Sequence, residues 1–424
     1  MKRPAPPYVV RPPTAVLTRG FDPRLSVGSA RPAVFRSSTY VFTSPESAAR
    51  AFDIALGKAR PARDESVDLI YSRLTHPNAD ILEDQIVPLE KGAAAAAVFN
   101  SGMAAISTMF LTLCAPGQHI VHTTPLYGGT QHLIHTILEP FGMKATAVRA
   151  GDGAALDAAI AGTKNLRVVM IETPANPTLV MTDIARAVEA ARRHPDAPLV
   201  VVDNTFLGPT FQHPLALGAD LALYSATKYL AGNSDMLAGV ALARDPDLVT
   251  ALRGTRAVLG NILQPDECWM LASRLPTVTL RMNRQSKNAQ RIAEALTRHP
   301  AVERVIYPSL FGDAEQARIR DAQCDYPGAV ISLELRGGRA AAFSFLRSLR
   351  IVRDAVSLGG VESLACHPRT TTHSELSDEE LDHAGVGESL VRLSVGIEDW
   401  RDLLADVREA LDTIAAEPRP VGRP

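Results

Sequence analysis

The 424-residue sequence has few cysteines, almost no net charge and no long apolar run, and each of these absences excludes a class of protein. The four cysteines, Cys114, Cys268, Cys324 and Cys366, are far apart and form no C-x-x-C pair, so neither a disulfide framework nor a zinc clamp is expected. A formal charge of −2 provides no broad basic face for nucleic acid. A small neutral or zwitterionic substrate fits this charge balance better.

The sequence also lacks a recognisable targeting or membrane segment. It begins "MKRPAPPYVVRPPTAV", which is basic but interrupted by prolines, so it has no signal-peptide apolar run. No later stretch approaches the length of a membrane span. We therefore expect a soluble, unprocessed protein of the reducing cytoplasm, with neither a membrane nor a nucleic acid as its partner.

The apolar pattern indicates an α/β fold. From about Asn78, helix-like stretches alternate with the short runs "HIVHTT", "ATAVRA", "LRVVMIET", "APLVVVDNT", "DLALYSAT" and "AGVALAR". This alternation predicts a mostly parallel sheet with helices on both faces, in a large domain of residues 78–280. A long helix, the strand-like "GAVISLEL" and a last amphipathic helix from about Asp399 then predict a smaller α/β domain, residues 281–424.

Two further segments have a marked composition. The proline-rich start predicts an extended arm, residues 1–77, that lies against something else, because proline removes a backbone donor and disfavours helix in the residue before it. The alanine run in "KGAAAAAVFNSG", residues 91–102, favours a helix over a linker, because alanine is the best helix former.

The stretch "YSATKYLAGNSD" places Lys228 among small and hydroxylated neighbours that suit a backbone passing close to a bound group. Asp203 ends the strand-like "LVVVD", and the lysine segment follows "DLALY". In open parallel sheets, ligand-binding residues gather just beyond the carboxyl ends of the strands. An acid that pairs with a pyridinium nitrogen and a lysine that forms a Schiff base are what pyridoxal phosphate (PLP) requires. Asp203 alone could equally cap a loop.

The phosphate of such a cofactor needs its own binding groups. In "FNSGMAAIST", Ser101, Gly102 and Met103 sit where a turn opens a helix, so free backbone N–H groups and the helix dipole favour an anion there. The hydroxyl groups of Ser225 and Thr227 are further donors. A Ser-Gly pair at a helix start is, by itself, more often only a cap.

Eight motifs in order along the chain resemble those of the Cys/Met-metabolism family of PLP enzymes, which includes cystathionine γ-synthase, cystathionine lyases, methionine γ-lyase and the acylhomoserine sulfhydrylases. They are "YSRLTHP", "NSGMAAI", "PLYGGT", "ETPANPT", "VVDNTF", "SATKYLAGNSD", "SLGGVESLACHP" and "RLSVGIED". The resemblance runs from about Thr18 to Leu411. It implies the fold type I of PLP-dependent transferases.

The resemblance also implies roles for residues around the cofactor. Lys228 matches the lysine that holds PLP, Asp203 the partner of the pyridinium nitrogen, and Tyr127 the tyrosine that stacks on the ring and moves a proton to or from the leaving group. The phosphate cradle matches Gly102, Met103, Ser225 and Thr227.

Substrate and partner residues follow in the same way. Asn176 matches a residue near the phenolic oxygen of the cofactor and the substrate carboxylate, and Ser357 with Arg392 matches the carboxylate-binding pair. A planar guanidinium suits bidentate recognition of a carboxylate. Tyr71 and Arg73 match a pair that reaches the phosphate in the neighbouring subunit, which implies a homodimer with shared active sites and, as in relatives, a homotetramer.

Two positions depart from the patterns of this family, and a third, Gly129, agrees with its synthases and many sulfhydrylases but not with its methionine γ-lyases. His76 replaces the usual asparagine of "YSRxxNP", and Asn233 replaces the histidine of "GHSD". Gly129 stands where methionine γ-lyases usually carry a cysteine. These departures leave the cofactor residues intact, and the substrate preference stays open.

The reaction we expect is γ-elimination from a methionine- or homoserine-type amino acid, giving a 2-oxo acid and ammonia. The alternative is γ-replacement, as in cystathionine γ-synthase or an acylhomoserine sulfhydrylase. A non-catalytic PLP-binding regulator comes last, because it would be expected to have lost Lys228, Tyr127 or Arg392.

Two other chemistries fit the sequence poorly. "GDGAAL" from Gly151 is a partial dinucleotide fingerprint, but Leu156 stands where a glycine or alanine is needed. The histidine pairs of "HIVH" and "HLIH", residues 119–122 and 132–135, lack a carboxylate or cysteine ligand set, so hydrogen-bonded histidines are expected there and no metal.

Overall fold

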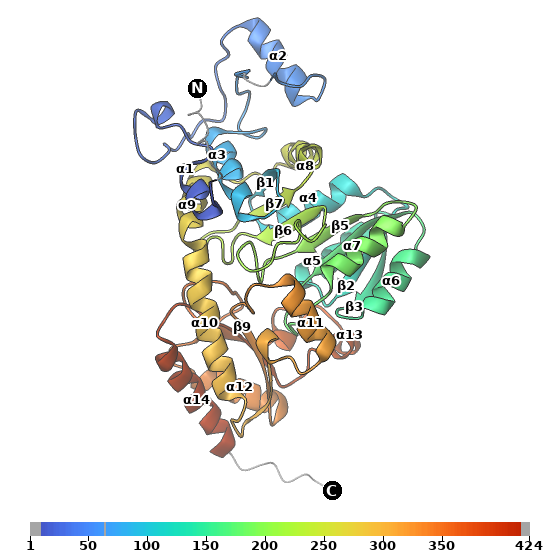
Figure 1. Cartoon of the computed structure of the whole chain (residues 1–424), viewed down its shortest axis with the longest axis vertical. Helices are drawn as coiled ribbons and strands as arrows, with labels where there is room; N and C mark the ends of the chain where they lie inside the picture. Colours follow the sequence, from blue (N-terminus) through green and yellow to red (C-terminus); the bar gives the residue numbers. More distant parts are fainter. Residues whose placement is uncertain (1–9, 63–64, 417–424) are drawn as a thin grey trace.

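The computed structural model describes residues 10–62 and 65–416. Two sheets follow one another along the long axis of the molecule, with the N-terminal segment at one end and the last helix at the other (Figure 1). Across the described ranges, no helix combines the length and the apolar character needed to cross a membrane.

The larger sheet has seven strands in the order β1-β7-β6-β5-β4-β2-β3. Strands β2 to β6 run parallel to one another, whereas β7 is antiparallel to both β1 and β6. The mostly parallel sheet predicted from the sequence is therefore confirmed. Its strands are β1 (Ala95–Phe99), β2 (His119–Thr124), β3 (Lys144–Arg149), β4 (Leu166–Glu172), β5 (Leu199–Asp203), β6 (Leu221–Ser225) and β7 (Gly239–Ala243).

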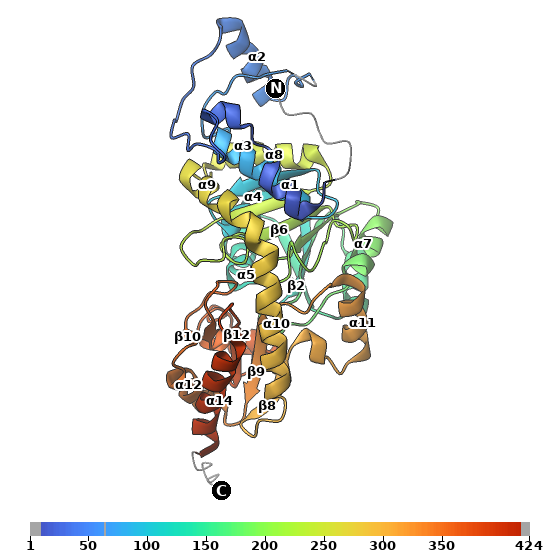
Figure 2. The same cartoon turned by 60° about the vertical axis from the view of Figure 1, so that its left-hand side comes forward.

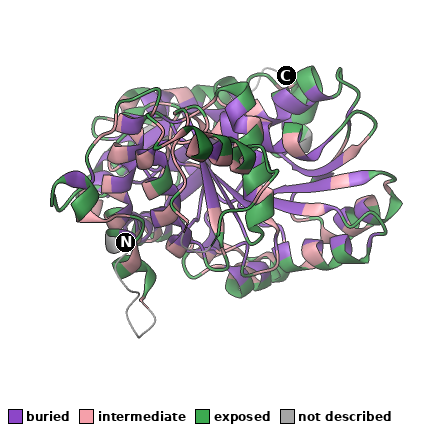
Figure 3. Ribbon diagram, turned by 90° about the horizontal axis from the view of Figure 1, so that it is seen from above, coloured by how far each residue is buried: buried purple, intermediate pink, exposed green. Residues whose placement is uncertain are grey.

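Helices cover both faces of this sheet, which explains why its central strands β5, β6 and β7 are almost entirely apolar. In β4, Val168 and Met170 pack into one cluster with α4 (Gly102–Leu113) and α8 (Pro246–Leu259). The alternate residues Val169 and Ile171 pack into another cluster, with α6 (Gly153–Gly162) and α7 (Ile184–Arg193). The viewpoint of Figure 3 shows the buried strands enclosed by helices that are exposed on their outer sides.

The helix predicted for the alanine run is wrong, because residues 95–99 form strand β1. Each residue of β1 pairs with β7, from Ala95 opposite Ala243 to Phe99 opposite Gly239. Val98 and Phe99 lie in separate clusters on the two sides of the strand. Tertiary pairing and burial thus override the intrinsic helix preference of alanine.

The smaller sheet has five strands in the order β10-β11-β12-β9-β8, of which only β10 and β11 run parallel. Helices α10, α12 and α14 pack beside it, and Figure 2 shows α10 running along both sheets. The elements after β7 and α8 are α9 (Pro265–Arg274), α10 (Val278–Leu296), β8 (Val302–Ile306), α11 (Ala314–Gln323), β9 (Val330–Leu335), α12 (Gly338–Ser348), β10 (Arg353–Asp354), β11 (Leu364–Cys366), α13 (Asp378–His383), β12 (Leu390–Ser394) and α14 (Trp400–Ala416).

The division into domains at residues 280 and 281 stays a prediction. Helix α10 spans that point, and one cluster of buried side chains includes both Val240 of the larger sheet and Leu333 of the smaller. The two sheets therefore share a core.

The predicted arm is only partly extended. Its first nine residues lie outside the described residues, and the rest contains α1 (Pro12–Thr18) and α2 (Pro45–Ala55) before α3 (Pro77–Ile86) begins. Figures 1 and 2 show α2 projecting away from both sheets. The strand-like stretches on either side of α2 meet at a bridge between Thr39 and Tyr71.

Candidate active site

A cavity of about 320 Å³ opens at the carboxyl ends of the parallel strands of the larger sheet, where such sheets bind ligands. It lies between the two sheets, because Arg392 on β12 forms part of its wall. Most of the site residues predicted from the sequence line it: Ser101, Gly102, Met103, Tyr127, Asn176, Asp203, Ser225, Thr227, Lys228 and Arg392.

Lys228 lies in the turn that follows β6, and its ammonium Nζ donates a hydrogen bond to Ser357 Oγ at 3.0 Å. That bond brings Ser357 to the site. Gly359 makes the approach possible, because a Cβ there would lie 2.7 Å from the backbone nitrogen of Tyr229, and its φ of +76° is left-handed. Burial, with the nearby Arg392 charge, lowers the pKa of Lys228 to about 8. A neutral amine is therefore accessible near neutral pH.

Asp203 ends β5 and is buried. Its Oδ1 accepts hydrogen bonds from the backbone N–H of Thr205 at 3.0 Å and from the Thr205 hydroxyl at 2.6 Å. Both bonds end on one oxygen, so Oδ2 remains available to a ligand. Burial raises the pKa of Asp203, and a cationic ring nitrogen in the cavity would offset that cost. This carboxylate therefore fits the pyridinium of PLP.

The phosphate cradle predicted at the start of α4 is formed by closely packed backbone. Ser101 caps the helix, with its Oγ accepting from the N–H of Ala104 at 3.0 Å. A Cβ on Gly102 would lie 2.9 Å from the Cβ of Ser225, so glycine lets the helix start approach the end of β6. Thr227 donates instead to the carbonyl of Ala238 at 3.2 Å, so its role as a phosphate donor requires its hydroxyl to turn away.

Arg392 is buried and makes no ion pair within the described ranges. Its Nη1 donates to Asn176 Oδ1 at 2.8 Å, and its Nη2 donates to the carbonyls of Val356 and Ser357 at 3.3 and 3.2 Å. These neutral acceptors fix the guanidinium without neutralising it. A buried cation held in this way favours a carboxylate ligand.

Sequence reasoning missed Glu172, which also lines the cavity. Its Oε2 accepts from the backbone N–H of Tyr127 at 2.6 Å, and its Oε1 from that of Asn176 at 3.2 Å. Burial and the charge of Asp203 raise the pKa of Glu172 to about 8. The signal was present, because Glu172 ends the strand-like "LRVVMIE" as Asp203 ends "LVVVD".

Tyr71 and Arg73 do not line this cavity. They line a separate hollow with Arg36 and Asp266, and Arg73 Nη1 donates to the carbonyl of Ala257 at 2.5 Å. Their contribution to the site of a neighbouring subunit stays a prediction.

The departures at His76 and Asn233 lie away from the chemistry. His76 is buried as the N-cap of α3, where its Nδ1 accepts from the N–H of Ala79 at 3.2 Å and its Nε2 donates to the carbonyl of Leu263 at 2.9 Å. Asn233 is exposed in the loop after the lysine turn. The described residues contain no group of three or more His, Cys, Asp or Glu that could hold a metal.

Comparison with known proteins gives concordant results. The family described as Cys/Met metabolism PLP-dependent enzyme matches residues 13–412. The chain is 40% identical to the L-methionine gamma-lyase of Pseudomonas putida, over 95% of this chain and 97% of that one. It is 40% identical to a cystathionine beta-lyase of Bacillus subtilis, over 81% of this chain and 86% of that one.

Among solved structures, a cystathionine gamma synthase from Xanthomonas oryzae pv. oryzae, in complex with aminoacrylate and cysteine, is similar with a TM-score of 0.87. The two chains are 33% identical, over 96% of this chain and 100% of that one. The match to the family covers nearly the whole sequence and includes both sheets and every wall of the cavity. The chain therefore belongs to the Cys/Met metabolism family of PLP-dependent enzymes.

Proposed function

We propose that this enzyme catalyses γ-elimination from methionine or a related γ-substituted amino acid, releasing a 2-oxo acid and ammonia. One structural observation carries the proposal: the partly buried amine of Lys228 shares a cavity with Asp203 and with the unneutralised Arg392. The similarity to the Pseudomonas putida enzyme over almost the whole chain supports elimination as the outcome.

The cofactor, when bound, supplies an electron sink for the bonding pair left at the substrate Cα. Arg392 is placed to bind the substrate carboxylate, with Ser357 and Asn176 beside it. The Lys228 amine can take a proton from Cα, because its lowered pKa leaves about half of it neutral near pH 8. Once it has given up that proton, the same amine can take one from Cβ. Tyr127 has a partly exposed side chain in the cavity wall, and we assign it proton transfer with the leaving group.

γ-Replacement is the second candidate, and Gly129 is the observation that favours it. A Cβ at this position would lie 2.8 Å from Tyr127 Cε1 and 3.1 Å from Met103 Sδ. The tyrosine ring therefore occupies space that a cysteine side chain needs, so the site differs here from that expected of a methionine specialist.

We also propose that the chain forms a homodimer with shared active sites, and that two such dimers form a homotetramer. The position of Tyr71 and Arg73 outside the cavity of their own chain supports this. The apolar side chains of Leu25, Val27 and Val41 are exposed in the arm, where a second subunit would cover them. All four cysteines are free thiols, which agrees with a reducing compartment such as the cytoplasm.

The proposed reaction is tested with the PLP-loaded enzyme and methionine in the absence of any added thiol. Methionine and water should give methanethiol, 2-oxobutanoate and ammonia, with the 2-oxo acid measured by reduction with a coupled dehydrogenase. Lys228→Ala should bind the cofactor without turning over. Absence of 2-oxo acid from the unsubstituted enzyme would reject elimination from methionine.

A further inference from the structure

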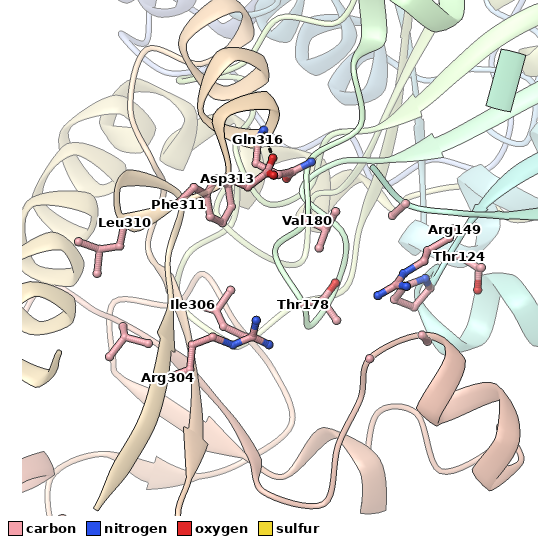
Figure 4. Close-up of a pocket in the computed structure, with 16 residues that line it drawn as sticks. Thr124, Arg149, Thr178, Val180, Arg304, Ile306, Leu310, Phe311, Asp313 and Gln316 are labelled. Atoms are coloured by element: carbon pink, nitrogen blue, oxygen red, sulfur yellow. Dashed lines mark hydrogen bonds between the residues drawn. The ribbon is translucent and has the colours of Figure 1, made fainter. Parts of the chain in front are cut away.

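A second cavity, of about 350 Å³, lies between the two sheets (Figure 4). One wall comes from the ends of β2 and β3 and from the turn at residues 178–180. The other comes from β8, the 3-10 turn Pro308–Leu310 and the start of α11. Its volume lies in the range of small-molecule sites. Its lining shares no residue with the candidate active site.

The cavity lining contains one arginine without a carboxylate partner in the described residues. Arg149 ends β3, is exposed, and has no ion pair or side-chain hydrogen bond within the described ranges. Arg304 stands on the opposite wall. The Glu334 carboxylate accepts hydrogen bonds from its Nε at 2.9 Å and from its Nη2 at 2.6 Å. Figure 4 shows both guanidinium groups pointing into the cavity from opposite sides. Asp313 adds a carboxylate to the wall that α11 contributes; it caps that helix, accepting from the N–H of Gln316 at 2.8 Å, and keeps its negative charge.

The rest of the lining is largely apolar. Val180, Ile306, Leu310 and Phe311 are partly buried there and form a surface for a hydrocarbon or aromatic body. One unpaired guanidinium balances one carboxylate, whereas a nucleotide would bring more negative charge than the cavity neutralises. We propose that this cavity is a second ligand site, which binds a small monocarboxylate with an apolar body and places the carboxylate on Arg149.

The site is joined to the active centre through two short loops. Pro125 lines the second cavity while Tyr127, two residues on, lines the active site. Thr178 lines the second cavity while Asn176 lines the active site. Glu172 holds the backbone N–H of Tyr127 and of Asn176 on its two oxygens. A ligand packed behind these loops therefore acts on the residues around the cofactor.

The smaller sheet is tied to the same loops. Gln316 of α11 accepts from the N–H of Met181 at 2.7 Å and donates to its carbonyl at 2.9 Å. A ligand that also touches Leu310 and Phe311 bridges the two sheets at this point. Coupling of this kind is reciprocal, so occupancy of the active site must change affinity at the second site by the same factor.

The ligand site is tested by fluorine NMR titration of the PLP-loaded enzyme with 4-fluorophenylacetate. Saturable binding should weaken about tenfold or more in Arg149→Ala, because a charge-assisted hydrogen bond is lost. Val180→Trp should weaken it similarly by filling the cavity, and the neutral 4-fluorophenylacetamide should bind as weakly. Lys144→Ala removes an exposed cation at the other end of β3 and should leave binding unchanged.

Absence of saturable binding would overturn the proposal, as would equal affinity in the unsubstituted enzyme and Arg149→Ala, which would place the probe elsewhere. Coupling is read without any substrate, by comparing probe affinity in the cofactor-free and PLP-loaded protein. A change of about twofold or more supports it, and equal affinities reject it. None of these measurements depends on which amino acid the enzyme cleaves.

Discussion

Glu172 and Asp203 are paired residues at the carboxyl ends of the parallel strands β4 and β5, and both are buried. Asp203 is one reason that the pKa of Glu172 rises to about 8. The pair thus gives the active site an acid suited to a cationic cofactor ring and a second acid that holds the backbone of Tyr127 and Asn176. We assign Glu172 as a positioning residue.

Glu172→Gln should lower kcat/KM by about 10- to 100-fold, because the amide group of glutamine can accept from only one of the two backbone N–H groups. The substrate KM should rise because Asn176 is less well positioned, and kcat should fall because Tyr127 is less well positioned. The cofactor absorbance band should remain. Glu139→Gln is the matched control, since Glu139 is an exposed carboxylate whose partner is His135. Unchanged kcat and KM in Glu172→Gln would remove Glu172 from this role.

Attachment of PLP to the cofactor-free protein should depend on pH through Lys228. Burial lowers the pKa of this lysine to about 8, so its reactive neutral form increases as pH rises toward 8 and is nearly complete above 9. The attachment rate should therefore rise about tenfold per pH unit below 8 and level off above it. Stopped-flow absorbance measures the rate, and reduction with borohydride followed by peptide mapping identifies the lysine.

Arg392→Met is the companion variant for this pH profile, because the Arg392 charge also lowers the pKa of Lys228. Its profile should level off at a higher pH than that of the unsubstituted protein. A rate that still rises tenfold per unit up to pH 10 in the unsubstituted protein, or a label on another lysine, contradicts the assignment.

Gly129→Ala should reduce kcat, because the added Cβ would lie 2.8 Å from the Tyr127 ring and would displace it. Gly254→Ala is the control, since no atom lies within 4 Å of a Cβ there and alanine suits the middle of α8. Steady-state kinetics on the same substrate separate the two. Equal kcat values would show that the ring position at Gly129 does not matter.

Shared active sites predict that two inactive variants complement each other. Arg73→Ala and Lys228→Ala subunits, refolded or co-expressed together, should recover about a quarter of full activity. In a random mixture half of the dimers are hybrids, and each hybrid has one site with both groups intact. Two affinity tags and sequential purification isolate the hybrids. Inactive hybrids that have been shown to contain both chains would refute the shared site.

The sequence predicts the parts of this enzyme that follow from local rules. Asp203 and Lys228 meet at one cavity because parallel strands end at the same edge of a sheet. Glu172 obeys the same rule and opens the motif "ETPANPT", but only Asn176 of that motif was given a role. The strand at Ala95–Phe99 escaped prediction, because its pairing with β7 depends on a segment more than a hundred residues away.

Other contacts can be found only in three dimensions. The bond between Lys228 and Ser357 joins residues 129 positions apart; the family resemblance pointed to each residue but not to the bond between them. The departure at His76 left the substrate preference open, but in the structure its ring serves as a helix cap and binds the carbonyl of Leu263. The second cavity has no sequence signature, since its two arginines lie on strands of different sheets.

The measurement that tests the proposed γ-elimination most directly is the partition between elimination and replacement. The PLP-loaded enzyme is incubated with methionine, cystathionine, O-acetylhomoserine or O-succinylhomoserine, each with and without cysteine or sulfide, and the 2-oxo acid and thioether are both quantified. We predict that 2-oxobutanoate forms from methionine without any thiol and that added thiol diverts only a minor part of the flux. Turnover of an acylhomoserine only when a thiol is present, yielding cystathionine or homocysteine and no 2-oxo acid, would contradict the proposed reaction.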